Sequence, residues 1–355
     1  MNKATLVLKD GTKFSGKSFG APLSSAGEVV FNTSMVGYPE SFTDPSYSGQ
    51  IMILTYPLIG NYGVGGSCLD QDKISKRFES EKVHIKGLIV NEYSENYSHW
   101  DANKSLKQWL TKNNIPAITD IDTRALTQKI REHGTILGKI IIDDKDLEFY
   151  DNDRENQVAK VSIKKPKTYK KGKKTIVCVD CGMKNNIIRS FLDRDVTVIR
   201  IPWNYDFIEA GLEFDGVFIS NGPGDPENLP ELVEIAKKVL ELKKPFFGIC
   251  LGTQIMAMAS GAKTYKLKFG HRAQNQPCTD VESGHCYITS QNHGFAIDEK
   301  SLNKDWKVWL KNLNDQTIEG IKHRSLPYFA CQFHPEAAPG PTDTTHFFDE
   351  FIAML

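Results

Sequence analysis

Apolar residues recur along this chain in short runs, and the rhythm of these runs changes about halfway along. In the first part, predicted strands at 4–8 and 13–17 form a hairpin, because Asp10-Gly11 between them is a favoured tight turn. The other predicted elements are strands at 29–32, 51–56, 87–90, 115–118 and 138–142 and helices at 106–110 and 122–133. Residues 1–150 are therefore expected to form a domain of mixed α+β structure.

From residue 175 onward, short apolar runs alternate with helical stretches. The predicted strands are 175–179, 196–201, 216–220, 246–249 and 328–333, and the predicted helices are 185–193, 229–242, 254–259 and 345–354. This alternation predicts an α/β domain over residues 175–355, with a mainly parallel sheet flanked by helices. Ligands of such domains bind at the carboxyl ends of the strands, so side chains there are candidates for chemistry.

Between the two parts the apolar pattern lapses, and eight lysines fall between residues 160 and 174. We interpret residues 151–174 as an exposed, lysine-rich linker. A basic run can bind nucleic acid, but this one lacks a groove-reading element and has Tyr169 as its only aromatic residue. No nucleic-acid partner is therefore expected.

Composition agrees with a two-domain globular protein. The 355 residues carry no formal net charge and are 40% apolar. No apolar run approaches the roughly 20 residues that span a bilayer, and the amino-terminal segment lacks the features of a signal peptide. Seven scattered cysteines suit a reducing compartment. We therefore expect a cytoplasmic protein without a membrane partner.

The strongest chemical signal is Gly248-Ile249-Cys250-Leu251-Gly252, which joins an apolar strand to a helical stretch. A sharp strand-to-helix turn with a glycine on each side of a cysteine has the shape of a nucleophile elbow. The positive end of the helix dipole favours a thiolate, so Cys250 is predicted to be a nucleophile. The alternative is an inert, buried cysteine at the end of a strand.

Possible partners for this thiol lie near the end of the chain. His334 directly follows the predicted strand 328–333, and Glu336 stands two residues further on. In this arrangement the carboxylate can orient the imidazole while the imidazole serves the thiol. A lone His-x-Glu can also be a surface coincidence, so the prediction depends on the elbow cysteine in the same domain.

With these residues, two further segments resemble a class I, or triad, glutamine amidotransferase: Ser220-Asn221-Gly222-Pro223-Gly224-Asp225-Pro226 and Ser290-Gln291-Asn292-His293-Gly294-Phe295. The first part is similar to the small subunit of carbamoyl phosphate synthetase, or to the same region of the fused eukaryotic polypeptides. The segments that carry this second similarity are 31–40, 43–47 and 54–63. The resemblance covers essentially the whole chain.

The resemblance implies that Cys250 attacks the side-chain amide of L-glutamine and forms a thioester, with His334 and Glu336 completing a triad. It implies an oxyanion hole made by the Leu251 N–H and the Gly222 backbone. The positions implied to hold glutamine are Ser46, Gly222, Gly224, Leu251, Gln254, Asn292, Gly294 and Phe295. For Ser46 the alternative is a simple turn serine after Asp44-Pro45.

The resemblance also implies partners. The chain would supply ammonia to a synthetase large subunit or a fused synthetase domain, which consumes ATP, Mg and bicarbonate. No cofactor and no metal are expected in this chain itself, since it has no phosphate-binding loop signature. The sequence leaves two questions open: whether the chain is a separate subunit or part of a fusion, and whether it serves pyrimidine or arginine synthesis.

Four residues need separate interpretation. Thr253 stands where the family usually has His, and we expect it to tune substrate affinity or coupling. Thr253 keeps a weakly active regulatory or scaffold subunit as an alternative. An amidotransferase for another acceptor is a further alternative, independent of Thr253. Cys178 and Cys181 lack the further ligands of a zinc site, and Cys178 is expected in the core. His293 is expected to shape the glutamine pocket rather than act as a second base.

Overall fold

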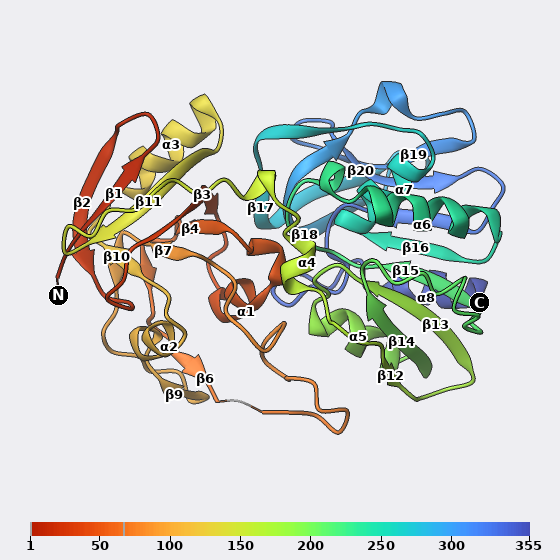
Figure 1. Ribbon diagram of the computed structural model, residues 1–355, viewed down its shortest axis with the longest axis horizontal. Coiled ribbons are helices and arrows are strands. Elements are labelled where there is room, and N and C mark those ends of the chain that lie inside the picture. The colour runs from red at the N-terminus through yellow and green to blue at the C-terminus, as the bar shows by residue number, and fades with distance from the viewer. Residues whose placement is uncertain (1, 67) are drawn as a thin grey trace. The chain divides into compact units, whose positions relative to one another are not determined.

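The computed structural model describes residues 2–66 and 68–355 (Figure 1). The chain divides into two compact units, and the boundary along the chain falls between Glu155 and Asn156. Met1 and Ser67 lie outside the described residues.

The first unit is built around a closed barrel, in which the strands follow the order β1-β11-β3-β4-β7-β10-β2. The strands are β1 (Lys3–Leu8), β2 (Lys13–Ser18), β3 (Ser25–Asn32), β4 (Gln50–Leu54), β7 (Gly87–Ile89), β10 (Ala117–Thr119) and β11 (Ile136–Ile142). The predicted hairpin is confirmed, because β1 and β2 pair antiparallel. Closure pairs every strand of the barrel on both sides, so that no sheet edge is left open.

Helices and two short strand pairs complete this unit. They are α1 (Tyr38–Thr43), η1 (Pro45–Tyr47), α2 (Leu106–Lys112), α3 (Thr123–His133), and β5 (Leu58–Ile59) with β8 (Glu92–Tyr93) and β6 (Val64–Gly65) with β9 (Ala102–Lys104). The helix α3 begins where the sequence predicts, because the Asp122 carboxylate accepts a hydrogen bond from the Ala125 N–H at 2.9 Å. The mixed α+β prediction is confirmed.

The second unit contains a ten-stranded sheet in the order β12-β14-β13-β15-β16-β21-β20-β19-β17-β18. The strands of the parallel half are β13 (Lys174–Asp180), β14 (Val196–Pro202), β15 (Gly216–Ile219), β16 (Phe246–Ile249) and β21 (Tyr328–Cys331). All five appear in the sequence-based prediction.

The other half of this sheet is antiparallel and was not predicted. Its strands are β17 (Thr264–Asp280), β18 (Cys286–Ile297), β19 (Trp306–Asn312) and β20 (Ile318–His323). The β17/β18 pair has register shifts between Lys266 and His271 and between Ala273 and Gln276. Such irregularities interrupt the alternation of buried and exposed residues by which a strand is recognised in a sequence.

Helices cover both faces of the parallel half. They are α5 (Asn185–Leu192), α6 (Pro230–Glu241), α7 (Leu251–Ala259) and α8 (His346–Met354). On β15, Val217 and Ile219 belong to the same buried cluster as residues of α6 and α7. The ring of Phe218, between them, contacts Phe191 of α5 at 5.2 Å between centroids. Successive side chains of a strand point to opposite faces, so the predicted helix-flanked sheet is confirmed.

The lysine-rich segment is more structured than a linker. It contains η2 (Asn152–Arg154), α4 (Val158–Val161) and β12 (Lys167–Tyr169), and β12 pairs antiparallel with β14. Val158 and Tyr169 are buried, whereas the eight lysines are exposed. The structure therefore differs from the linker prediction, because a few buried residues among many lysines are too sparse to produce a visible apolar period.

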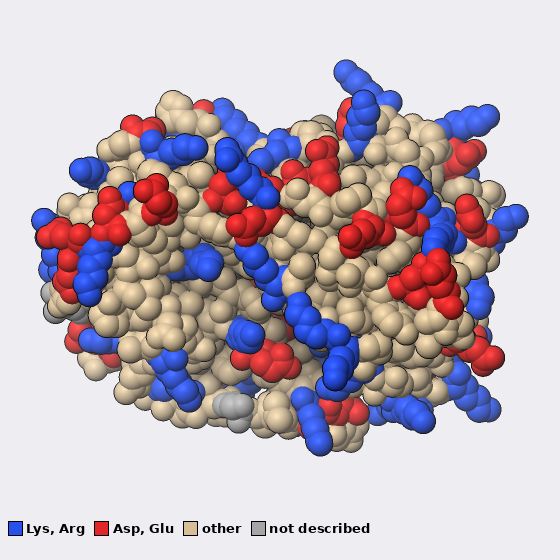
Figure 2. Space-filling view, in the orientation of Figure 1, with Lys and Arg blue, Asp and Glu red and all other residues tan. Residues whose placement is uncertain are grey.

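The surface carries both signs of charge. On the face drawn in Figure 2, Lys and Arg are interspersed with Asp and Glu, in keeping with equal numbers of basic and acidic residues. In the part of the chain that the structure describes, the helices are too short or too polar to cross a membrane.

Candidate functional site

Cys250 lies in a strained turn between β16 and α7. Its backbone has φ 54° and ψ −103°, a conformation that a residue with a side chain rarely adopts. A Cβ atom added at Gly252 would lie 2.1 Å from the Ile219 carbonyl oxygen, and one at Gly248 would lie 2.7 Å from the Gly252 backbone. The glycines therefore permit the close approach of strand and helix that the elbow prediction requires.

The register of the sheet brings the predicted triad together. β16 and β21 are parallel neighbours, with Ile249 opposite Cys331, so the residues that follow both strands meet at one edge of the sheet. The Cys250 N–H donates a hydrogen bond to the Cys331 carbonyl at 2.9 Å. His334 Nδ1 lies 2.7 Å from Glu336 Oε1, and both side chains are buried.

The electrostatics of this pair favour an imidazolium beside a carboxylate. Burial opposes charge on the His334 ring, but the Glu336 carboxylate and the Cys250 thiol outweigh burial and raise the pKa of His334. Burial likewise opposes charge on Glu336, yet Lys184 and His334 hold the pKa of that carboxyl below its ordinary value. His334 Nε2 has no hydrogen-bond partner of normal geometry, although the neighbouring thiol contributes to the pKa of the ring. This nitrogen is therefore free to exchange a proton with a bound substrate.

Lys184 is a residue of this site that the sequence analysis missed. Its ammonium lies 3.0 Å from Glu336 Oε1 and donates a hydrogen bond to the Ala337 carbonyl, and its side chain is 3% exposed. It lies directly before α5, at the carboxyl end of β13. The available signal was a lysine at the end of a buried parallel strand, where charged side chains tend to be functional. Lys184 therefore neutralises the buried Glu336 and fixes its position.

The two backbone segments predicted to form an oxyanion hole lie together. A Cβ atom added at Gly222 would meet the Cys181 carbonyl at 2.2 Å and the Leu251 side chain at 2.8 Å. The Leu251 N–H belongs to the first turn of α7, where no carbonyl of the helix is available to it. This N–H can therefore bind a negatively charged oxygen above the Cys250 sulfur.

Four of the predicted glutamine-binding residues lie on β18 and α7, and one of them contacts the sulfur. The Cys250 Sγ contacts the Asn292 carbonyl at 3.7 Å. Gln254 Nε2, one turn along α7, donates a hydrogen bond to the Phe295 carbonyl at 3.1 Å. Gly294 lies between Asn292 and Phe295, and a Cβ there would meet only Arg272 within 4 Å, at 3.4 Å. This stretch of β18 therefore forms one wall of the candidate site.

The remaining predicted positions are placed as follows. Gly224 has φ +89° in the loop after β15 and lies against Gln157. Ser46 belongs to the first unit, where its N–H donates to the Asp44 carboxylate at 2.9 Å in η1. This hydrogen bond is the turn geometry of the alternative interpretation of Ser46, and a glutamine-binding role for Ser46 stays a prediction.

Thr253 is an uncharged residue in the first turn of α7. It is fully buried, and its hydroxyl donates a hydrogen bond to the Cys331 carbonyl at 2.6 Å. Cys178 and Cys181 are also buried, and burial raises the pKa of both thiols well above the ordinary range, as expected of core cysteines. All seven cysteines are free.

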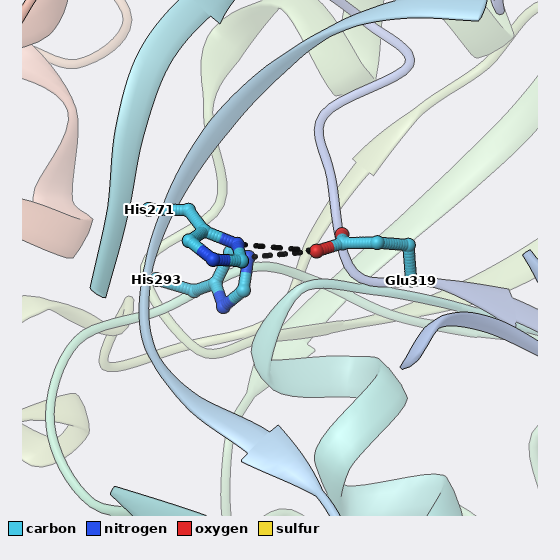
Figure 3. Close-up of side chains that lie close together, drawn as sticks. All are labelled: His271, His293 and Glu319. Atoms are coloured by element: carbon cyan, nitrogen blue, oxygen red, sulfur yellow. Dashed lines mark hydrogen bonds and ion pairs between the residues drawn. The ribbon is translucent and has the colours of Figure 1, made fainter. Parts of the chain in front are cut away.

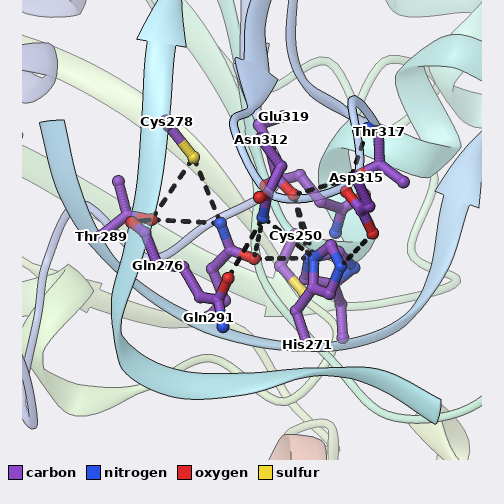
Figure 4. A network of polar contacts seen from close by, with 12 residues as sticks. Cys250, His271, Gln276, Cys278, Thr289, Gln291, Asn312, Asp315, Thr317 and Glu319 are labelled. Atoms are coloured by element: carbon purple, nitrogen blue, oxygen red, sulfur yellow. Dashed lines mark hydrogen bonds and ion pairs between the residues drawn. The ribbon is translucent and has the colours of Figure 1, made fainter. Parts of the chain in front are cut away.

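A second buried cluster lies beside this wall. His271, His293 and Glu319 offer nitrogen and oxygen atoms within 4.8 Å of one another (Figure 3), and among the described residues this is the group that could hold a metal ion. Figure 4 shows the wider network, which runs from Cys278 and Gln291 to Asp315 with Cys250 alongside. His293 Nδ1 lies 2.9 Å from the Phe295 carbonyl, so this ring contacts the stretch of β18 that forms the wall.

Two family models match the chain. The model described as glutamine amidotransferase class-I matches residues 177–354. The model described as carbamoyl-phosphate synthase small chain, CPSase domain, matches residues 6–140.

Similar curated proteins include both a small chain and longer polypeptides. The carbamoyl phosphate synthase arginine-specific small chain of Saccharomyces cerevisiae is 48% identical over 99% of this chain and 88% of that protein. The multifunctional protein CAD of Squalus acanthias is 52% identical over 98% of this chain and 16% of that protein. The mitochondrial carbamoyl-phosphate synthase (ammonia) of Homo sapiens is 48% identical over 99% of this chain and 24% of that protein. The chain thus spans most of the small chain but a quarter or less of these longer relatives.

Proposed function

Because the chain belongs to the family of carbamoyl-phosphate synthase small chains with a class I glutamine amidotransferase domain, we propose that it is the glutaminase component of a glutamine-dependent carbamoyl phosphate synthetase. It hydrolyses L-glutamine to glutamate and supplies ammonia to a synthetase large subunit or fused synthetase domain. The observation that carries this proposal is the strained Cys250 elbow beside the buried His334–Glu336 pair.

In the first half-reaction, the Cys250 thiolate attacks the side-chain amide carbon of glutamine. A C–S bond forms, and the negative oxygen of the tetrahedral intermediate binds the Leu251 N–H and the Gly222 backbone. His334, which the raised pKa keeps protonated at neutral pH, gives its proton to the departing nitrogen. The C–N bond breaks, ammonia leaves, and a glutamyl thioester stays on Cys250.

In the second half-reaction, water attacks the thioester carbon while His334 takes a proton from it. The C–S bond then breaks, which releases glutamate and restores the thiolate. Glu336 keeps the ring oriented through both steps, and Lys184 keeps Glu336 charged. Ser46, Gly222, Gly224, Leu251, Gln254, Asn292, Gly294 and Phe295 hold the glutamine in this proposal.

The chain needs no cofactor for these steps, and ATP, Mg and bicarbonate are used by the synthetase partner. We place the protein in the cytoplasm. One relative is named for ammonia, so membership of the family does not by itself imply glutamine hydrolysis. The presence of Cys250 in a reactive setting is what favours a glutaminase over a weakly active scaffold subunit.

The test is glutamate release by the full chain, with and without a synthetase large subunit, together with mass spectrometry of a trapped glutamyl adduct. Cys250→Ser and Cys250→Ala are compared with Cys178→Ala, which alters a buried cysteine away from the elbow. We expect an adduct on Cys250 and loss of glutamate release in both Cys250 variants only. Absence of adduct and turnover in the wild type, even with the synthetase subunit, would favour the scaffold interpretation.

A further inference from the structure

The network beside residues 292–295 of β18 is a chain of titratable groups from three strands. His271 on β17 stands opposite His293 on β18. Glu319 on β20 has its Oε1 3.2 Å from His271 Nδ1 and 3.6 Å from His293 Nε2 (Figure 3). Asp315, in the turn before β20, lies 2.8 Å from His271 Nε2. Both nitrogens of His271 thus face carboxylates, which is the arrangement of a doubly protonated ring.

This network reaches the candidate site through main-chain atoms. The Phe295 carbonyl is contacted by His293 Nδ1 at 2.9 Å and by Gln254 Nε2 at 3.1 Å. Asn292, the neighbour of His293, has its carbonyl 3.7 Å from the Cys250 sulfur. A shift of the His293 ring would therefore move the stretch of β18 that lies against the nucleophile.

The pairing of this stretch with β17 is interrupted, because a register shift separates the His271–His293 pair from the Lys266–Phe295 pair. The β17/β18 ladder is irregular on both sides of the short matched segment that contains His271 and His293. A bulge bends its strand and disrupts the ladder locally, so contacts from outside the ladder can influence the path of the strand there. Glu319, fully buried on a third strand, contacts both rings and so fixes this segment from outside the ladder.

We propose that Glu319, together with His271 and Asp315, positions residues 292–295 of β18 for glutamine binding. Glu319 touches neither the reacting atoms nor the nucleophile, so it is a positioning residue. The inference rests on the proposed glutaminase function and adds to it a group that sets the affinity for glutamine.

A zinc ion in this cluster is the competing explanation. Ligand atoms of a tetrahedral zinc site lie about 3.3 Å from one another when each is about 2.0–2.1 Å from the ion. The Glu319 oxygen is at comparable distances from the two rings, 3.2 and 3.6 Å, but the atoms of the cluster spread over as much as 4.8 Å. Each ring nitrogen of His271 faces a carboxylate oxygen, Glu319 at Nδ1 and Asp315 at Nε2. In this arrangement both nitrogens carry hydrogen and neither offers a lone pair to a metal, which favours the positioning role.

The test measures glutamine binding separately from turnover. Dissociation constants for L-glutamine are measured by calorimetry in a Cys250→Ser background, and KM and kcat are measured with Cys250 present. Glu319→Leu removes both contacts, and Glu319→Gln keeps an acceptor oxygen for His271. Asp315→Asn weakens the network from its more exposed end, and Lys322→Gln, on the same strand but outside the network, is the control.

We expect Glu319→Leu to raise KM and the dissociation constant at least about tenfold while kcat changes less than about threefold, because uniform binding is lost. Glu319→Gln should have a KM and a dissociation constant within about threefold of the wild-type values. Asp315→Asn should raise KM about two- to threefold, and Lys322→Gln should leave KM, kcat and the dissociation constant unchanged.

Unchanged affinity in Glu319→Leu would overturn the inference. The inference would also be overturned if kcat fell equally in Glu319→Leu and Glu319→Gln and in proportion to the fraction of unfolded protein. Such a result would mean that Glu319 serves only to stabilise the fold. One equivalent of zinc in the purified wild type, by elemental analysis, would assign the cluster to a metal instead. If the single variant Cys250→Ser does not bind glutamine, the proposed function and this inference are overturned together. If Cys250→Ser binds glutamine normally and adding Glu319→Leu does not change the affinity, only the inference is overturned.

Discussion

Lys184→Met tests whether the buried ammonium is what makes a charged Glu336 tolerable at the site. The two groups are 3.0 Å apart and at most 3% exposed, so neither is screened by water. Removing one partner of a buried ion pair costs about 3–5 kcal/mol, because the other charge stays buried. Since His334 still faces Glu336 at 2.7 Å, we expect the lower end of this range, about 3 kcal/mol of unfolding free energy.

The assay is urea unfolding of the full chain, with Lys237→Met as the matched control. Lys237 and Glu234 are closer, at 2.6 Å, but 48% and 66% exposed, and such surface pairs contribute less than about 0.5 kcal/mol. Distance alone would rank the two variants in the opposite order. Equal losses in both variants would refute the argument that burial gives the Lys184 contact its strength.

The pH dependence supplies a second, independent check. The pKa of Glu336 is lowered in the folded protein, so the carboxylate contributes stability above its ordinary pKa and loses it as pH falls through the folded value. Lys184→Met removes a cause of this lowering. The gap in unfolding free energy between wild type and Lys184→Met should therefore narrow as the pH falls below about 4.5. A gap that stays constant down to pH 3 would show that Lys184 acts through packing alone.

Two further variants follow from the same structure. The pKa of His271 is raised to about 9 from 6.5, so the stability that the protonated ring contributes is complete below pH 6.5 and is lost as the pH rises through 9. Over this interval the unfolding free energy of the wild type, measured with urea, should fall by up to about 3 kcal/mol. The unfolding free energy of His271→Gln should fall much less. Gly252→Ala places a Cβ 2.1 Å from the Ile219 carbonyl, whereas Gly211→Ala meets nothing within 4 Å at φ +66°. We expect Gly252→Ala to lose about 3 kcal/mol and the trapped glutamyl adduct, and Gly211→Ala only about 1 kcal/mol with the adduct retained. Similar behaviour of the two alanine variants would contradict the tight-elbow geometry.

The parts of the site that the sequence could predict are those encoded locally. The glycines near Cys250 and the position of His334 directly after an apolar strand predict the local geometry from a few neighbouring residues. Lys184 carries only the weak signal of its place after a buried strand, and Glu319 carries none, because their roles depend on strands distant in sequence that the sheet brings beside them. The antiparallel half of the sheet was missed for a related reason, since its irregular ladder obscures the period of two.

The structure also bears on the one departure from the family pattern at the elbow. The Cys331 carbonyl accepts hydrogen bonds from both the Cys250 N–H, at 2.9 Å, and the Thr253 hydroxyl, at 2.6 Å. Cys331 ends β21, and His334 follows it by three residues. The elbow is thus tied on both sides of its turn to the strand that carries the base. A threonine here therefore holds the turn at Cys250 against the strand that leads to His334 without placing another titratable ring beside them, an arrangement compatible with the proposed triad.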